Sequence, residues 1–102
     1  MSTSITTRPR TESKARTERP KVYKVILLND DYTPREFVVG VLAAVFRMTG
    51  SQAEGVMLTA HQKGACVVAV FTREIAETKA TQAIDLATSQ GYPLMFTTEP
   101  ED

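Results

Sequence analysis

The hydrophobic positions of the chain change their spacing several times between Lys21 and Glu99, and each change predicts a new element. The run KVYKVILL, residues 21–28, is short and rich in β-branched residues, which predicts a strand covered on both faces. The run ACVVAVF, residues 65–71, predicts a central strand, and YPLMFTTE, residues 92–99, predicts a last one.

Between these runs the apolar residues recur at helical spacing, which predicts three helices. The first is expected to begin at Pro34, run to about Met48 and stop at Gly50. The second is expected from Ser51 to Gly64, and the third from Thr72 to Gly91. The expected inner stripe of the third helix is Ile75, Ala76, Ala80, Ala83, Ile84 and Ala87.

Polar residues at the predicted helix starts fit the capping box, in which a hydroxyl and a carboxylate three residues later satisfy free backbone amides. The pairs are Thr33 with Glu36 and Ser51 with Glu54, and Thr72 is expected to cap the third helix. The predicted order β-α-α-β-α-β indicates an α+β sandwich, with helices packed on one side of a three-stranded sheet.

The length and composition of the chain indicate one small domain. The chain has 102 residues, 42% of them hydrophobic, and no apolar run approaches the roughly eighteen residues of a membrane span. With no apolar N-terminal segment resembling a signal peptide, we expect a cytoplasmic protein that does not contact the membrane. The single cysteine, Cys66, lies inside an apolar run and is expected to be a small core residue.

Charge is unevenly distributed, although it sums to zero. Residues 1–20 carry five Lys or Arg against two Glu, and Ile5 is their only large apolar residue, which predicts a disordered arm before a core domain at 21–102. A transit peptide is disfavoured by the two Glu and the lack of an amphipathic stripe. Nucleic-acid binding is disfavoured by the acidic body.

The stretch LLNDDYTPREF, residues 27–37, concentrates the candidate chemistry in one acidic turn. One interpretation is a plain turn, because Asn and Asp side chains bond nearby backbone amides. A metal site is disfavoured because Asn29, Asp30 and Asp31 are adjacent rather than spaced as in a calcium loop. Catalysis is disfavoured because no recognised nucleophile, phosphate-loop or zinc-hydrolase motif is present.

The remaining interpretation is a receptor for a cation, since an amide oxygen and two carboxylates accept hydrogen bonds from an ammonium group. The material for an apolar pocket is at hand, since helical spacing can bring Met57, Ala60 and His61 to a common face and apolar residues flank the turn. The flanking residues are Leu27, Leu28, Thr33 and Val38. The alternative is that Met57 and Ala60 fill the core and His61 is a buried, hydrogen-bonded histidine. Residue chemistry alone does not decide between these two interpretations.

From about Val22 to Thr98 the sequence resembles the ClpS family, adaptors of the Clp AAA+ proteases that deliver substrates bearing N-degrons. The matching blocks, in order, are KVILLNDDYTPREFVVGVL, MLTAH, VFTREIAETK and YPL. The resemblance implies a fold similar to the C-terminal domain of the ribosomal stalk protein, with an antiparallel sheet. It also implies a non-enzymatic protein that needs no cofactor or metal.

The resemblance implies that Asn29, Asp30 and His61 bind the free α-amino group of the substrate. Asp31 is expected near the first peptide group or as a support of the turn. The substrate's first side chain, Phe, Tyr, Trp or Leu, is expected in an apolar pocket. The expected lining is Leu27, Leu28, Thr33, Arg35, Val38, Met57, Ala60 and Leu94.

Two positions depart from the family's usual residues. Arg35 stands where many members have a Met at the pocket rim, and Ala60 stands where a Val lines the wall. We expect these changes to alter the ranking of first residues, and Arg35 to discriminate against a positive or bulky second residue.

The resemblance further implies that Glu74 and Lys79 dock on the N-terminal domain of a Clp unfoldase, ClpA or a relative. The arm would then reach the unfoldase pore. A monomeric adaptor that delivers N-degron substrates is the first functional hypothesis. The alternative is a diverged module that binds the unfoldase N-terminal domain and modulates or inhibits it without reading N-degrons.

Overall fold

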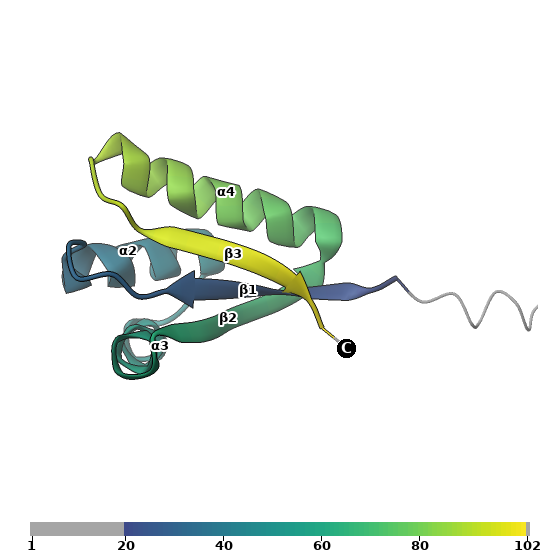
Figure 1. Ribbon diagram of the computed structural model, residues 1–102, viewed down its shortest axis with the longest axis horizontal. Coiled ribbons are helices and arrows are strands. Elements are labelled where there is room, and N and C mark those ends of the chain that lie inside the picture. Colours follow the sequence, from purple (N-terminus) through teal and green to yellow (C-terminus); the bar gives the residue numbers. More distant parts are fainter. Residues whose placement is uncertain (1–19, 102) are drawn as a thin grey trace, which may run out of the picture.

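The computed structural model describes residues 20–101, which form six elements in the predicted order (Figure 1). These are β1 (Val22–Leu28), α2 (Arg35–Phe46), α3 (Gly50–Lys63), β2 (Ala65–Thr72), α4 (Arg73–Ser89) and β3 (Met95–Pro100). The predicted α+β class is therefore confirmed. The arm expected over residues 1–20 lies outside the described residues except for Pro20.

The three strands form one antiparallel sheet in the order β2-β1-β3. Its central strand is β1, so the prediction of a central strand at residues 65–71 was wrong. Among the described strands, β1 alone buries three consecutive residues, Val25, Ile26 and Leu27, and it has a neighbouring strand on each side. The β2 run is equally apolar, but its Val67 and Val70 stay exposed at the edge of the sheet.

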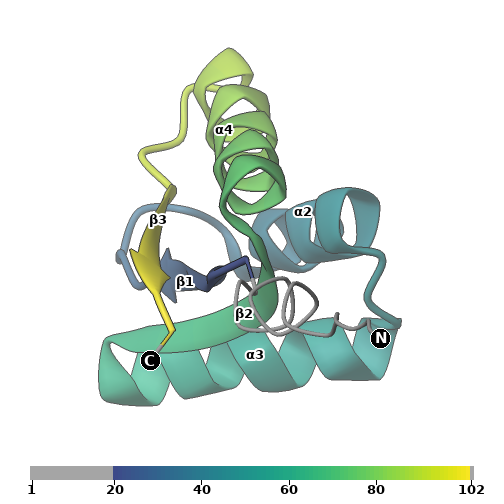
Figure 2. The same ribbon diagram turned by 90° about the vertical axis from the view of Figure 1, so that its right-hand side faces the viewer.

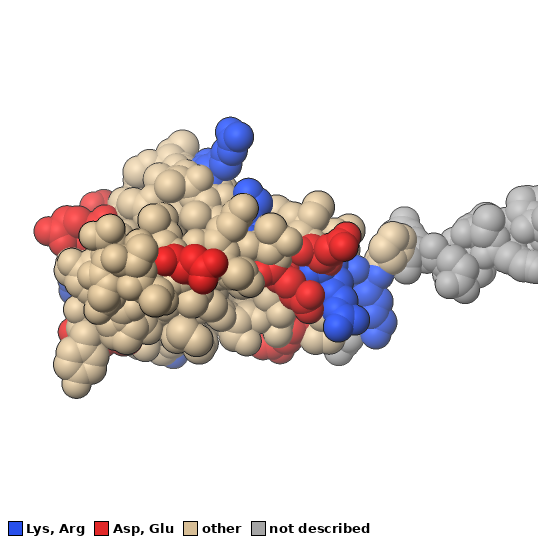
Figure 3. Space-filling model, turned by 90° about the horizontal axis from the view of Figure 1, so that it is seen from above, with Lys and Arg blue, Asp and Glu red and all other residues tan. Residues whose placement is uncertain are grey.

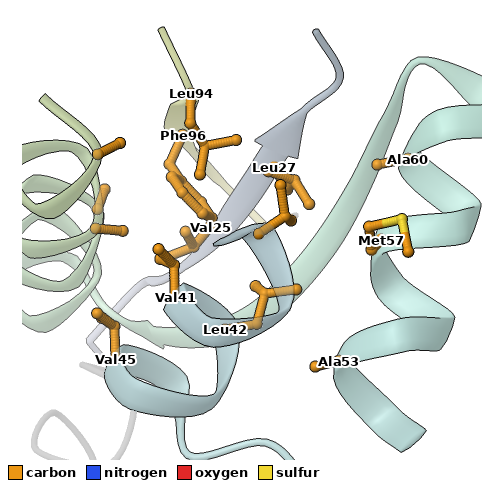
Figure 4. Close-up of a cluster of buried hydrophobic side chains, with 14 of the residues drawn as sticks. Val25, Leu27, Val41, Leu42, Val45, Ala53, Met57, Ala60, Leu94 and Phe96 are labelled. Atoms are coloured by element: carbon orange, nitrogen blue, oxygen red, sulfur yellow. The ribbon is translucent and has the colours of Figure 1, made fainter. Parts of the chain in front are cut away.

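The helices gather on one face of the sheet and enclose the core with it (Figures 1 and 2). Side chains from β1, α2, α3 and β3 meet there, as the close-up shows (Figure 4). Among the described residues, the largest fully buried side chains are Leu27, Leu42, Val25 and Val41. No helix of this part of the chain is long and apolar enough to cross a membrane.

Helix α4 packs on the sheet through small residues. Its buried stripe is Ala76, Ala80, Ala83 and Ala87. The prediction that Ile75 belongs to this stripe was wrong, because its side chain is 48% exposed. Ile75 precedes Ala76 and so points about 100° away around a helix of 3.6 residues per turn.

The beginning of α2 differs from the predicted capping box. Pro34 is the N-cap residue and no side chain caps the helix, because the Thr33 hydroxyl donates to Asp30 instead. The helix ends at Phe46, where Arg47 adopts a left-handed conformation with φ 59°. Gly50 is therefore not the stop of this helix but the first residue of α3.

The beginning of α3 lies slightly earlier than predicted. Its capping box is formed by Thr49 and Gln52, not by Ser51 and Glu54. The sequence offers both pairs at the same spacing, and the structure uses the earlier one. The predicted end at Gly64 is confirmed, since this glycine has φ 91° and its backbone N–H donates a hydrogen bond to the carbonyl oxygen of Ala60.

Candidate functional site

The connection between β1 and α2 is organised by the carboxylate of Asp30. Its Oδ1 accepts hydrogen bonds from the backbone N–H groups of Tyr32 (2.8 Å) and Thr33 (2.7 Å). Its Oδ2 accepts from the Thr33 hydroxyl at 2.9 Å. The turn interpretation of the sequence therefore holds for Asp30, whose side chain shapes the backbone around it.

A second contact ties this turn to the far end of α3. The backbone N–H of Asn29 donates to the carbonyl oxygen of Gly64 at 3.0 Å. Because Gly64 also ends α3, this bond holds the last turn of that helix, with Ala60 and His61, next to the acidic turn. Two segments more than thirty residues apart in the sequence are thereby fixed side by side.

A cavity of about 270 Å³ opens at this junction. Every residue expected in the α-amino site or the pocket lines it, and so does Pro34, which had been expected only as the start of a helix. Figure 4 shows Leu27 from β1 and Met57 and Ala60 from α3 turned toward the same space. The full lining is Leu27, Leu28, Asn29, Asp30, Asp31, Thr33, Pro34, Arg35, Val38, Met57, Ala60, His61 and Leu94.

The cavity has an apolar floor and a polar rim. Leu27, Ala60 and Leu94 are each 2% exposed, so they belong both to the core and to the cavity wall. His61 is exposed, which rules out the interpretation of a buried histidine. Each of the two sequence interpretations therefore holds for some of these residues. Met57 and Ala60 are core residues, whereas His61 lies exposed at the rim of the cavity.

The rim is rich in hydrogen-bond acceptors. A carboxylate offers about four acceptor sites, and Asp30 uses three of them within the turn. Asp31 and the side chain of Asn29 are exposed and make no hydrogen bond to another described residue. Within residues 20–101 no group of three or more His, Cys, Asp or Glu side chains is placed to hold a metal ion.

Cys66 lies apart from this cavity and packs partly buried against the core. Burial raises the pKa of the Cys66 thiol, and the nearby Lys63 opposes the shift only in part. The thiol is therefore held in its neutral, weakly nucleophilic form. The structure thus favours the packing role that the sequence suggested for this residue.

The two residues expected to dock on an unfoldase differ in their surroundings. Glu74 is exposed in the first turn of α4. The Lys79 ammonium is partly buried and donates to the carbonyl oxygen of Val45 at 3.0 Å, which fastens α4 to the last turn of α2. Figure 3 shows acidic and basic side chains side by side at the end of the body next to the grey residues, with mostly uncharged surface elsewhere.

Similarity to known proteins covers nearly all of the chain. The family described as "ATP-dependent Clp protease adaptor protein ClpS" matches residues 18–97. The ATP-dependent Clp protease adapter protein ClpS 2 of Mesorhizobium japonicum is 63% identical over 96% of this chain and 97% of its own. ClpS 1 of Bradyrhizobium diazoefficiens is 66% identical over 94% of this chain and 95% of its own.

A solved structure agrees with these sequence matches. It is Agrobacterium tumefaciens ClpS2 bound to L-phenylalaninamide, which superposes with a TM-score of 0.80 at 65% identity. The match covers 81% of this chain and all of that one. Sequence and fold thus confirm the resemblance, and the chain belongs to the ClpS family of ATP-dependent Clp protease adaptors.

Proposed function

We propose that the cavity binds the first residue of proteins with an unmodified N-terminal Phe, Tyr, Trp or Leu, and that the protein delivers them to a Clp unfoldase. The observation that carries this proposal is an acceptor-rich rim directly above an apolar floor in a single cavity. The Agrobacterium tumefaciens relative binds L-phenylalaninamide, a ligand that offers both a free α-amino group and an aromatic side chain.

The rim suits an α-amino group because that group is a donor-only cation. Its reference pKa of roughly 7.7–8.0 leaves it mostly an ammonium with three N–H donors at neutral pH. In our proposal the acceptors are the Asn29 side-chain oxygen, the remaining site of Asp30 and a ring nitrogen of His61. Asp31 would face the first peptide group, since its carboxylate is exposed beside them.

The floor suits one large apolar side chain. A volume of about 270 Å³ lies below the roughly 300–1,000 Å³ of sites for drug-sized ligands, so it fits a single residue rather than a longer segment. Burying a Phe or Leu side chain there contributes about 1.5–3 kcal/mol. Ala60 leaves more room at the wall than a Val would, which favours aromatic over aliphatic first residues.

The deciding experiment is a titration of fluorescent peptides that differ only in their first residue and its amine. A peptide that begins with free Phe is expected to bind, and its acetylated form to lose at least about a hundredfold in affinity, because the ammonium and its charge-assisted bonds are gone. Equal binding of the two forms would overturn the proposal.

The pH dependence of the same titration gives an independent check. Between pH 7 and pH 9 the fraction of ammonium falls about tenfold for an amine with a pKa near 8. Affinity for the free-Phe peptide is therefore expected to fall by about the same factor. No loss of affinity up to pH 9 would contradict ammonium recognition.

The partner side of the proposal concerns the N-terminal domain of a Clp unfoldase, ClpA or a relative. Glu74 is its best supported contact, because it is exposed. Lys79 can take part only through the two N–H donors that Val45 leaves free. A monomeric, non-enzymatic adaptor in the cytoplasm completes this proposal, which sedimentation, turnover assays and cell fractionation can test.

The arm expected over residues 1–20 is proposed to enter the unfoldase pore. Deleting residues 1–17 is expected to leave peptide affinity unchanged and to abolish adaptor-stimulated degradation. Full degradation by the truncated protein would contradict this role. A chain that binds the unfoldase but no free-Phe peptide would instead favour the modulating module.

A further inference from the structure

A second groove lies between α2 and α3, next to the cavity of the proposed substrate site. Its volume is about 380 Å³, and it is lined by Arg35, Glu36, Val39, Glu54, Met57 and Leu58. Arg35 and Met57 line both spaces, so the two spaces adjoin at these side chains. A ligand seated in the first cavity therefore lies beside the second one.

Helical spacing gives this groove an apolar base with a carboxylate from each helix. On α2, Glu36 and Val39 are three residues apart, and on α3, Glu54 and Leu58 are four apart, so each pair lies on one face. The Leu58 side chain is 41% exposed, which leaves apolar surface available in the groove. Glu36 and Glu54 are both exposed, and neither has an ion-pair partner among residues 20–101.

We propose that this groove binds the side chain of the third residue of the substrate and favours Lys or Arg there. The proposal rests on the proposed function of the neighbouring cavity. In an extended peptide, successive side chains point to opposite sides, so the first and third residues share a side and lie about 7 Å apart. The third side chain is thus the next one directed at the protein after the first has entered its cavity.

A long basic side chain matches the chemistry of the groove better than the other classes do. Its methylenes cover Val39 and Leu58, and its charged head reaches the two carboxylates at the edge. Arg35 opposes a second cation, but one guanidinium faces two carboxylates. Glu36 also stabilises the positive end of the α2 dipole from its first turn, and that role leaves its carboxylate open to solvent and to a ligand.

The test is a set of free-Phe peptides, Phe-Ala-Xaa followed by a constant tail, in which Xaa is Ala, norleucine, Lys or Glu. Norleucine carries an aliphatic stem without a charge, and is expected to bind about fivefold more tightly than Ala. Lys is expected to gain about another threefold over norleucine through the exposed carboxylates, and Glu to bind no better than Ala. Equal affinity for all four peptides would overturn the proposal.

Three controls separate binding in this groove from the general attraction of a cation to an acidic body. Moving the Lys from the third to the fifth residue is expected to remove its advantage, and so is the double variant Glu36→Gln/Glu54→Gln. The matched variant Asp85→Asn changes an exposed acid on α4 and is expected to keep the full Lys advantage. An advantage that survives the double variant, or that falls equally in Asp85→Asn, would contradict the proposed groove.

The same peptides test the first cavity independently of the groove. Binding of the Phe-Ala-Ala peptide and its loss on acetylation report the α-amino site alone. If acetylation abolishes binding while Xaa has no effect, the groove is refuted and the proposed function stands. If acetylation has no effect, the proposed function fails whatever the third residue does.

Discussion

Residues 20–101 contain two strand-to-helix connections that are built in opposite ways. Between β1 and α2 the chain takes six residues, 29–34, which bend around the carboxylate of Asp30. Between β2 and α4 it takes none, because Thr72 ends the strand and Arg73 begins the helix. There, Arg73 pairs with Glu77 at 3.2 Å and lies over the ring of Tyr23.

The difference shows how a long connection can keep a fixed shape while some of its polar groups stay available to a ligand. In the long connection one side chain satisfies the backbone donors, so the turn keeps its shape while its other acceptors face outward beside a cavity. At the short connection Thr72 is the N-cap residue, but its side chain makes no cap hydrogen bond, and the adjoining Arg73 pairs with Glu77 at the surface. The first arrangement makes a binding site possible, whereas the second makes a compact corner.

The largest effect is expected from Asp30→Ala. Three hydrogen bonds to a partly buried carboxylate are lost, and the free energy of unfolding is expected to fall by about 3 kcal/mol. Urea denaturation measures this change. The neighbouring Asp31→Ala is the matched control and is expected to change stability by less than about 0.5 kcal/mol. Equal effects of the two variants would mean that Asp30 does not hold the turn.

Lys79→Met tests how α4, the helix that follows the short connection, is held against α2. The Met side chain keeps an apolar stem but leaves the carbonyl of Val45 without its donor. We expect a loss of about 1.5 kcal/mol in the free energy of unfolding, measured by denaturant titration. Unchanged stability would show that water replaces the ammonium at no cost, and that Lys79 is free for docking.

Thr33→Val separates the side-chain bond of the long connection from its backbone bonds, since it removes one hydroxyl without a large change of shape. The bond to Asp30 Oδ2 is lost, whereas both backbone bonds to Oδ1 remain. The expected cost is about 1 kcal/mol of unfolding free energy. A loss of unfolding free energy as large as that of Asp30→Ala would show that the hydroxyl bond, rather than the two backbone bonds, holds the turn in shape.

The smallest effect is expected at the short connection. Glu77→Gln removes the charge that pairs with Arg73 at an exposed position, and solvent screens such pairs strongly. Thermal unfolding of the variant is expected to coincide with that of the unchanged protein. A clear loss of stability would show that the corner depends on this pair after all.

The candidate site could be predicted from the sequence more completely than the details of the fold. The resemblance to the ClpS family named the residues that the structure brings to one cavity, whereas the acidic turn and the spacing of Met57, Ala60 and His61 had left two interpretations open. The capping of α2 could not be predicted, because Thr33 can bond either a helix amide or Asp30, and both partners are close in sequence. The order of strands was missed because two apolar runs of similar length look alike before they are packed.

Local chemistry explains what the sequence determined by itself. Hydrophobic spacing, turn residues and glycine stops act over a few residues, and they specified the order of elements and the acidic turn. Only the tertiary structure decided which strand lies in the centre and that Lys79 reaches Val45. These outcomes depend on competition between segments far apart in the chain, which no local pattern records.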